Sequence, residues 1–196
     1  MILTVLPPAA PAPTAPAFIE PMLASKLPIG LDADSYDPAE FVMEEKFDGI
    51  RLVVRVAGGR VRSWSRLGNL RTLSIDVMGQ LARMPDGVYD GELIEGSHSY
   101  DVHEGAALVL FDLLETLGRS AMHLSQTDRR RLLETAYSPV DVDGPVSLTV
   151  QQAPSVAGVV AIWARGGEGT IIKRRSACYR PGHRTADWVK VKARRR

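Results

Sequence analysis

A lysine flanked by carboxylates could carry covalent chemistry in this sequence. The segment Glu44-Glu45-Lys46-Phe47-Asp48-Gly49-Ile50-Arg51 puts Lys46 where a predicted strand runs into a turn at Asp48-Gly49, and the glycine allows close backbone approach. A lysine becomes a nucleophile when its ammonium loses a proton, through desolvation or neighbouring cations. The alternative is an exposed strand-end lysine that pairs with Glu or Asp. Taken alone, this segment favours the alternative.

Other chemically capable side chains also fall within or at the ends of predicted strands. They lie in the segments Asp90-Gly91-Glu92, Phe111-Asp112, Glu168 to Lys173, and Lys190-Val191-Lys192. A buried Asp112 in an apolar strand must be paired or bind something. Lys190 and Lys192 share one face of a strand, because side chains alternate with period two. They repel each other unless an anion lies between them. Carboxylates for a metal, lysines for phosphates and an aromatic ring for a base together indicate a nucleotide pocket.

The elements that position these residues alternate between strands and helices. Apolar and β-branched runs predict strands at 41–46, 50–56, 61–65, 88–95, 106–113, 146–151, 170–173 and 188–192. Helical spacing predicts helices at 70–84, 127–137 and 155–165. Gly58-Gly59 predicts a hairpin between two strands. The predicted fold class is therefore α+β, with largely antiparallel sheets flanked by helices rather than a doubly wound parallel sheet.

Composition excludes several classes of protein. The chain has 196 residues, a formal net charge of +1, 45% hydrophobic residues and 24% charged residues, which is typical of a globular domain. No apolar run reaches the roughly 18 residues of a membrane helix. The single cysteine, Cys178, cannot form an internal disulfide or a cysteine zinc cluster. No signal peptide is expected, so a reducing, cytoplasmic setting is predicted.

The two ends of the chain differ from its body. Six of the 13 prolines fall in the first 21 residues, and residues 1–17 are predicted to be a flexible Pro- and Ala-rich arm before a domain at 18–196. The last 24 residues hold ten Lys and Arg and one acid, Asp187. Such a basic end indicates a polyanion partner. A solvated tail is the alternative for Arg194 to Arg196.

These motifs resemble the covalent nucleotidyltransferase superfamily of ATP-dependent DNA ligases, RNA ligases and mRNA capping enzymes. The superfamily's lysine motif, Lys-x-Asp-Gly, is present at Lys46, and Arg51 follows it as in ligases. Ser65-Arg66-Leu67-Gly68 is similar to the next ligase motif, with Leu67 in place of the usual Asn. The later segments follow in the family's order, and Pro21-Met22-Leu23-Ala24 resembles the start of the catalytic domain in bacterial repair and end-joining ligases.

The resemblance implies an ATP-grasp-like nucleotidyltransferase fold and a three-step reaction. Lys46 would attack the α-phosphate of ATP, expel pyrophosphate and hold AMP as a phosphoramide. AMP would then pass to a DNA 5′-phosphate, and the adjacent 3′-hydroxyl would displace it and seal the nick. Positioning and charge neutralisation carry most of such a reaction.

Family pattern also implies roles for individual residues. Phe111 would stack on adenine, and Glu44 would bind its exocyclic amine. Arg66 and Glu92 would hold the ribose, and Lys173, Lys190 and Lys192 would contact the phosphates. Arg51 is also expected to bind the nucleotide. Glu168 and Glu92 would support Mg²⁺ or Mn²⁺.

Family ligases carry an oligonucleotide-binding (OB) barrel of about 100 residues after the last lysine motif, and this chain holds no such barrel. Without it, the first step is expected to be impaired. The chain is expected to be either an excised catalytic domain or a naturally minimal version that needs a partner, such as a separate OB-fold or repair and end-joining protein. Expected partners are nicked duplex DNA in the bacterial cytoplasm and nucleoid, with a monomeric protein and no membrane. The alternatives are an RNA ligase, a GTP-using capping enzyme, and a nick-binding module without catalysis.

Overall fold

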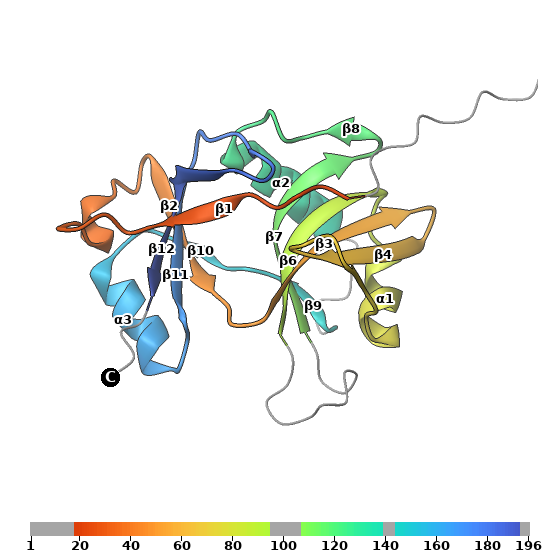
Figure 1. Cartoon of the computed structure of the whole chain (residues 1–196), viewed down its shortest axis with the longest axis horizontal. Coiled ribbons are helices and arrows are strands. Elements are labelled where there is room, and N and C mark those ends of the chain that lie inside the picture. Colours follow the sequence, from red (N-terminus) through yellow and green to blue (C-terminus); the bar gives the residue numbers. More distant parts are fainter. Residues whose placement is uncertain (1–17, 95–106, 139–143, 193–196) are drawn as a thin grey trace, which may run out of the picture.

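Two β-sheets packed against each other, with helices on their outer sides, make up the computed structural model (Figure 1). The structure describes residues 18–94, 107–138 and 144–192, and the predicted arm at 1–17 and Arg194 to Arg196 lie outside these ranges. Among the described residues, every strand pairing is antiparallel except β1 with β12 and β7 with β9. The predicted α+β class with largely antiparallel sheets is confirmed.

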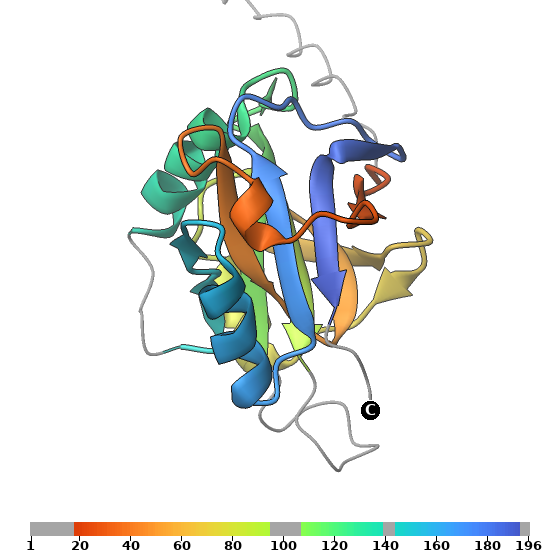
Figure 2. The ribbon, with the colours of Figure 1, turned by 90° about the vertical axis from the view of Figure 1, so that its left-hand side faces the viewer.

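The smaller sheet holds five strands. In spatial order they are β1 (Leu23–Lys26), β12 (Arg184–Lys192), β11 (Gly169–Arg174), β2 (Phe41–Lys46) and β10 (Gln151–Gln152). Figure 2 shows this sheet from its outer side, where α3 (Val156–Ala164) and a short 3₁₀ helix, η1 (Ala33–Ser35), lie. Met43, Ile172 and Val189 are buried in the apolar cluster on this side.

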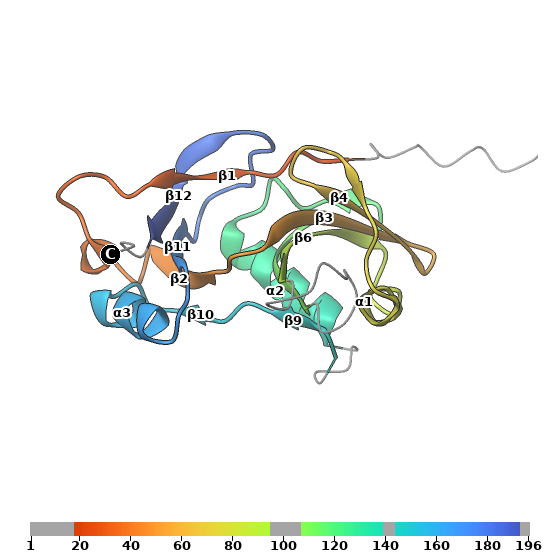
Figure 3. The same cartoon turned by 60° about the horizontal axis from the view of Figure 1, so that its bottom comes forward.

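The larger sheet holds seven strands. The main path runs β5 (Leu70–Arg71), β4 (Arg60–Ser65), β3 (Ile50–Ala57), β6 (Gly87–Ile94), β7 (Ala107–Thr116) and β8 (Arg119–Ser120), and β9 (Val146–Leu148) pairs with β7. Its outer face packs against α1 (Ile75–Leu81) and α2 (Gln126–Tyr137), as Figure 3 shows. Side chains of β3 alternate between the two faces of the larger sheet: Leu52 and Val54 face the helices, whereas Val53 faces the smaller sheet.

Local sequence accounts for the turns and caps. The predicted Gly58-Gly59 hairpin joins β3 to β4, with φ of 56° and 72° at the two glycines, values that favour glycine. Ser125 is the N-cap of α2, and its side chain accepts a hydrogen bond from the Asp128 amide. Buried Asp112, predicted to need a partner, pairs with Arg129 at 2.7 Å.

One predicted helix is wrong in its first part. Residues 70–84 have helical spacing, but Leu70 and Arg71 form β5 and pair with Trp64 and Ser63 of β4. The helix begins only after Ser74, whose hydroxyl accepts a hydrogen bond from the Val77 amide. Strand pairing after the tight turn at Ser65 to Gly68 therefore overrides the periodicity.

No helix among the described residues is long and apolar enough to cross a membrane.

Candidate active site

The lysine motif is where the chain crosses from one sheet to the other. β2 ends at Lys46 in the smaller sheet, and β3 begins at Ile50 in the larger one, so residues 47–49 connect the sheets rather than closing a hairpin. At Gly49 a Cβ atom would collide with the carbonyl oxygen of Leu93 on β6. The glycine therefore permits the close approach that the sequence predicts.

Strand register places the charged residues on the inner face of the smaller sheet. Lys46 on β2 pairs with Gly169 on β11, and Gly169 pairs with Lys192 on β12. The next rung on the same face joins Glu44, Ile171 and Lys190. Residues opposite each other in a sheet point to the same side. The three strands therefore direct their motif residues toward the larger sheet.

A cavity of about 90 Å³ opens between the two sheets at this face. Its lining includes six residues that the sequence predicts for the site: Glu44, Lys46, Arg51, Glu92, Phe111 and Lys173. It also includes Ala24, Glu45, Phe47, Ile171 and Trp188, which were not predicted as site residues. Charged groups from both sheets thus surround one aromatic-lined hollow.

Lys46 lies at the edge of this cavity in a chain of charges. Its ammonium donates a hydrogen bond to one oxygen of Glu168, and Lys192 binds the other oxygen at 2.5 Å. Burial alone would raise the pKa of Glu168, but hydrogen bonds from Lys192 and Lys46 outweigh burial and hold that pKa below its usual value. The sequence left open whether Lys46 is a nucleophile or an ion-paired lysine, and the structure shows a partly buried, ion-paired lysine beside the cavity.

Glu44 and Lys173 form a buried ion pair at one side of the cavity. The ammonium of Lys173 lies 2.6 Å from one carboxylate oxygen of Glu44, and the side chains are 2% and 3% exposed. Gln151 on β10 donates a hydrogen bond of 2.7 Å to the other oxygen. Lys173 also lies 4.8 Å from the ring centroid of Phe111 and 4.4 Å from that of Trp188. The predicted phosphate ligand Lys173 thus lies close to the aromatic wall.

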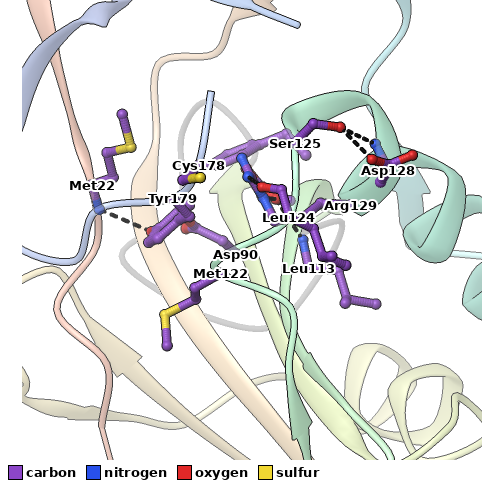
Figure 4. Close-up of polar contacts among 12 residues, drawn as sticks. Met22, Asp90, Leu113, Met122, Leu124, Ser125, Asp128, Arg129, Cys178 and Tyr179 are labelled. Atoms are coloured by element: carbon purple, nitrogen blue, oxygen red, sulfur yellow. Dashed lines mark hydrogen bonds and ion pairs between the residues drawn. The ribbon is translucent and has the colours of Figure 1, made fainter. Parts of the chain in front are cut away.

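Arg51 is held over the Phe111 ring by a buried hydrogen-bond network. Its guanidinium binds both oxygens of Asp90 at 2.6 Å and lies 4.5 Å from the ring centroid of Phe111. The hydroxyl of Tyr179 donates to Asp90 at 2.6 Å and accepts from the amide of Met22 at 2.9 Å (Figure 4). Burial, reinforced by Asp90, raises the pKa of Tyr179 well above its usual value. The hydroxyl therefore stays protonated and can donate to Asp90.

Glu92 faces the same cavity from β6. Burial raises its pKa from 4.5 to about 7, and the negative charges of Asp90 and Glu168 contribute in the same direction. The described residues hold no cluster of three or more carboxylate, histidine or cysteine side chains for a metal. Mg²⁺, however, commonly uses one or two carboxylates together with substrate phosphates. The two interacting carboxylates of Glu92 and Glu168 fit that pattern.

Lys190 belongs to a concentration of positive charge. Burial lowers the pKa of its ammonium, and four neighbouring cations lower it further. In order of effect these are Arg184, Lys192, Lys46 and Lys26. We call these five residues the basic cluster. In the described part of the chain, the cluster's carboxylate ion pairs are those that Glu168 makes with Lys46 and Lys192.

Four predicted site residues do not line the cavity: Arg66, Glu168, Lys190 and Lys192. The last three interact with one another or with Lys46, whereas Arg66 is exposed in the turn after β4. Of the residues that the sequence missed, only some carry a signal in the sequence. Ile171 and Trp188 follow from period-two alternation with Lys173 and Lys190, whereas Gln151 has no local signal.

The sequence is similar to those of known DNA ligases. Residues 94–192 match the family model for the ATP-dependent DNA ligase domain. LigD of Mycobacterium tuberculosis, a multifunctional non-homologous end joining DNA repair protein, is 34% identical over 188 residues, which cover 89% of this chain and 24% of LigD. A probable DNA ligase of Anaeromyxobacter is 31% identical and covers 89% of this chain and 38% of its own length.

Solved structures show the same similarity. The ligase domain of M. tuberculosis LigD superposes with a TM-score of 0.73 at 28% identity, covering 89% of this chain and 59% of that domain. A mycobacterial DNA ligase D complexed with ATP and MES superposes with a TM-score of 0.70 at 29% identity, and the match covers 89% of this chain and 60% of that one. The fold is therefore that of a nucleotidyltransferase domain.

The chain belongs to the ATP-dependent DNA ligase family, of the bacterial end-joining type. It spans about a quarter of the length of LigD and less than two fifths of the length of the Anaeromyxobacter protein.

Proposed function

We propose that this chain is the adenylation domain of an ATP-dependent DNA ligase and that Lys46 carries AMP. The observation that supports this most directly is the position of Lys46: its ammonium lies at the edge of the cavity that Phe111 and Glu44 also line. An aromatic ring and a hydrogen-bonding carboxylate suit a purine base, and the other four residues of the basic cluster suit the phosphates of the nucleotide.

The first step forms one bond and breaks another. The Lys46 ammonium gives a proton to water, and its nitrogen then bonds to the α-phosphorus of ATP and releases a second proton to water as the phosphoramide forms. The bond from that phosphorus to the bridging oxygen breaks, and pyrophosphate leaves with the electron pair. Glu168 is a poor proton acceptor because Lys192 and Lys46 lower its pKa. Its part in our proposal is to orient Lys46 through their ion pair.

The remaining residues bind and orient the nucleotide. We assign Phe111 to the base, Glu44 to its exocyclic amine and Glu92 to the ribose. We assign the phosphates to Lys173, Lys190 and Lys192. Arg66 is assigned to the ribose together with Glu92, and Arg51 is assigned to the nucleotide as a whole. A Mg²⁺ or Mn²⁺ ion held by Glu168 and Glu92 would neutralise phosphate charge when bound.

DNA would be the acceptor of the AMP group. The relatives' names describe DNA repair and end joining, and we propose the same substrate class for this chain: duplex DNA with a nick. The 5′-phosphate takes AMP from Lys46, and the 3′-hydroxyl then displaces AMP to close the strand. With this substrate, our proposal includes action on bacterial DNA in the cytoplasm.

Labelling with nucleotides tests the proposal. The 196-residue chain is incubated with Mg²⁺ and either α-labelled ATP or α-labelled GTP, and Lys46→Ala serves as the control. We expect label from ATP, little from GTP and none in the variant. Label from GTP alone would indicate capping chemistry. No label, together with tight binding but no sealing of pre-adenylated nicked DNA, would indicate a nick-binding module without catalysis.

A further inference from the structure

The first strand, β1, adds a lysine to the inner face of the smaller sheet. β1 runs parallel to β12 at the sheet edge (Figures 1 and 3). Lys26 pairs in register with Lys190, and the amide of Leu27 donates a hydrogen bond of 3.2 Å to the Lys190 carbonyl. Ala24, two residues before Lys26, lines the cavity. The β1–β12 pairing shifts register between Ala24 and Ser25, and Lys26 pairs with Lys190 beyond that shift. Because paired residues point to the same side of a sheet and Lys190 is on the inner face, Lys26 also lies on the cavity side.

One rung of residues crosses the whole smaller sheet. It runs Gln151, Glu44, Ile171, Lys190 and Lys26, through strands β10, β2, β11, β12 and β1. Carboxylate and amide groups lie at one end and two ammonium groups at the other. Strands lie about 4.8 Å apart, so Lys26 is about 14 Å from Glu44 along the rung. The face thus changes from groups suited to a base to groups suited to phosphates.

Lys26 and Lys190 form the basic end of the rung, and Arg184 is next to them. Among the described residues, no carboxylate forms an ion pair with Lys26, Lys190 or Arg184. The guanidinium of Arg184 instead donates a hydrogen bond to the backbone carbonyl of Ala24 on β1, which keeps its charge beside the two lysines. Like charges held together without a counter-charge favour binding of an anion.

We propose that Lys26, acting with Lys190, binds the β- and γ-phosphates of ATP and hence the pyrophosphate that leaves. The inference rests on the proposed function. Lys46 takes the α-phosphorus, and the leaving phosphates extend toward the β1 edge, where Lys26 is the outermost cation on the rung. Lys26 lies outside all of the family motifs in this sequence, so only the strand pairing reveals it.

Equilibrium binding separates this proposal from the proposed function. The probes are α,β-methylene-ATP, which cannot lose pyrophosphate, AMP and inorganic pyrophosphate. Lys26→Ala removes one charge-assisted contact, so we expect about tenfold weaker binding of the ATP analogue and of pyrophosphate, with AMP unchanged. Lys26→Arg should restore most of the affinity. Arg83→Ala removes an exposed cation at the end of α1 and should change nothing.

Kinetics give an independent readout. Lys26→Ala should raise the KM for ATP in lysyl-AMP formation and the pyrophosphate concentration needed to reverse it, while sealing of pre-adenylated nicks stays at the wild-type rate. Equal binding of the analogue and of pyrophosphate by wild type and Lys26→Ala would overturn the inference, even if Lys46 takes label. A loss confined to nicked-DNA binding would also overturn it and assign Lys26 to the DNA backbone. If Lys26→Ala binds the analogue more weakly than wild type but wild type forms no lysyl-AMP, only the proposed function fails.

Discussion

Removing Lys173 alone should destabilise the fold strongly. Lys173→Met keeps most of the side-chain volume but leaves the carboxylate of Glu44, 3% exposed, without its cation. The hydrogen bond from Gln151 remains, but a neutral amide does not replace a positive charge. Breaking a buried ion pair from one side costs about 3–5 kcal/mol. Since domains are stable by about 5–15 kcal/mol, this loss is a large part of the total.

Urea unfolding followed by circular dichroism measures the effect. A double variant, Glu44→Gln with Lys173→Met, also removes the unpaired negative charge of Glu44. It should regain most of the free energy of unfolding that Lys173→Met loses. Arg131→Met is the matched control: its partner is Asp128, both side chains are more than half exposed, and its loss should be about 0–1 kcal/mol. A loss of stability in Lys173→Met no larger than that in Arg131→Met would refute this reasoning.

Two further substitutions test the site's geometry and electrostatics. Because Glu92 has a pKa of about 7 in the fold against an ordinary 4.5, wild-type stability falls as pH rises between these values. Glu92→Gln should therefore have the same free energy of unfolding as wild type below pH 4.5 and become the more stable protein as pH approaches 7. Above pH 7 the difference in free energy of unfolding should stay constant. A difference in urea unfolding that does not depend on pH would contradict this prediction. Gly49→Ala should cost about 1–3 kcal/mol, because its methyl group would collide with the Leu93 carbonyl. At Gly79 an added Cβ would have no neighbouring atom within 4 Å, so Gly79→Ala should instead stabilise α1. Equal changes in thermal stability for the two variants would contradict the close approach of Gly49 to Leu93.

Local patterns predicted the strands that carry the chemistry. Period-two alternation fixes which face each residue takes, so Lys190 and Lys192 could be placed together before any fold was known. A buried carboxylate needs compensation, so Asp112 was expected to have a partner. That the partner is Arg129 follows only from the packing of α2 against β7.

Features built from distant parts of the chain escaped prediction. β1 is four residues long and pairs with β12, about 160 residues later in the chain. Nothing in its own sequence therefore indicates a strand. Gln151 reaches Glu44 only because β10 pairs with β2. The anchoring of Arg51 by Asp90 and Tyr179 likewise joins three separate segments. Strand pairing of this kind is set by tertiary packing and carries no local signal.

The most direct test of the account is the mass of the protein after incubation with ATP and Mg²⁺, followed by peptide mapping. We predict a gain of one adenylate, located on Lys46, that pyrophosphate removes and that Lys46→Ala never acquires. An unchanged mass, or an adenylate on any other residue, would contradict the assignment of Lys46 as the nucleophile.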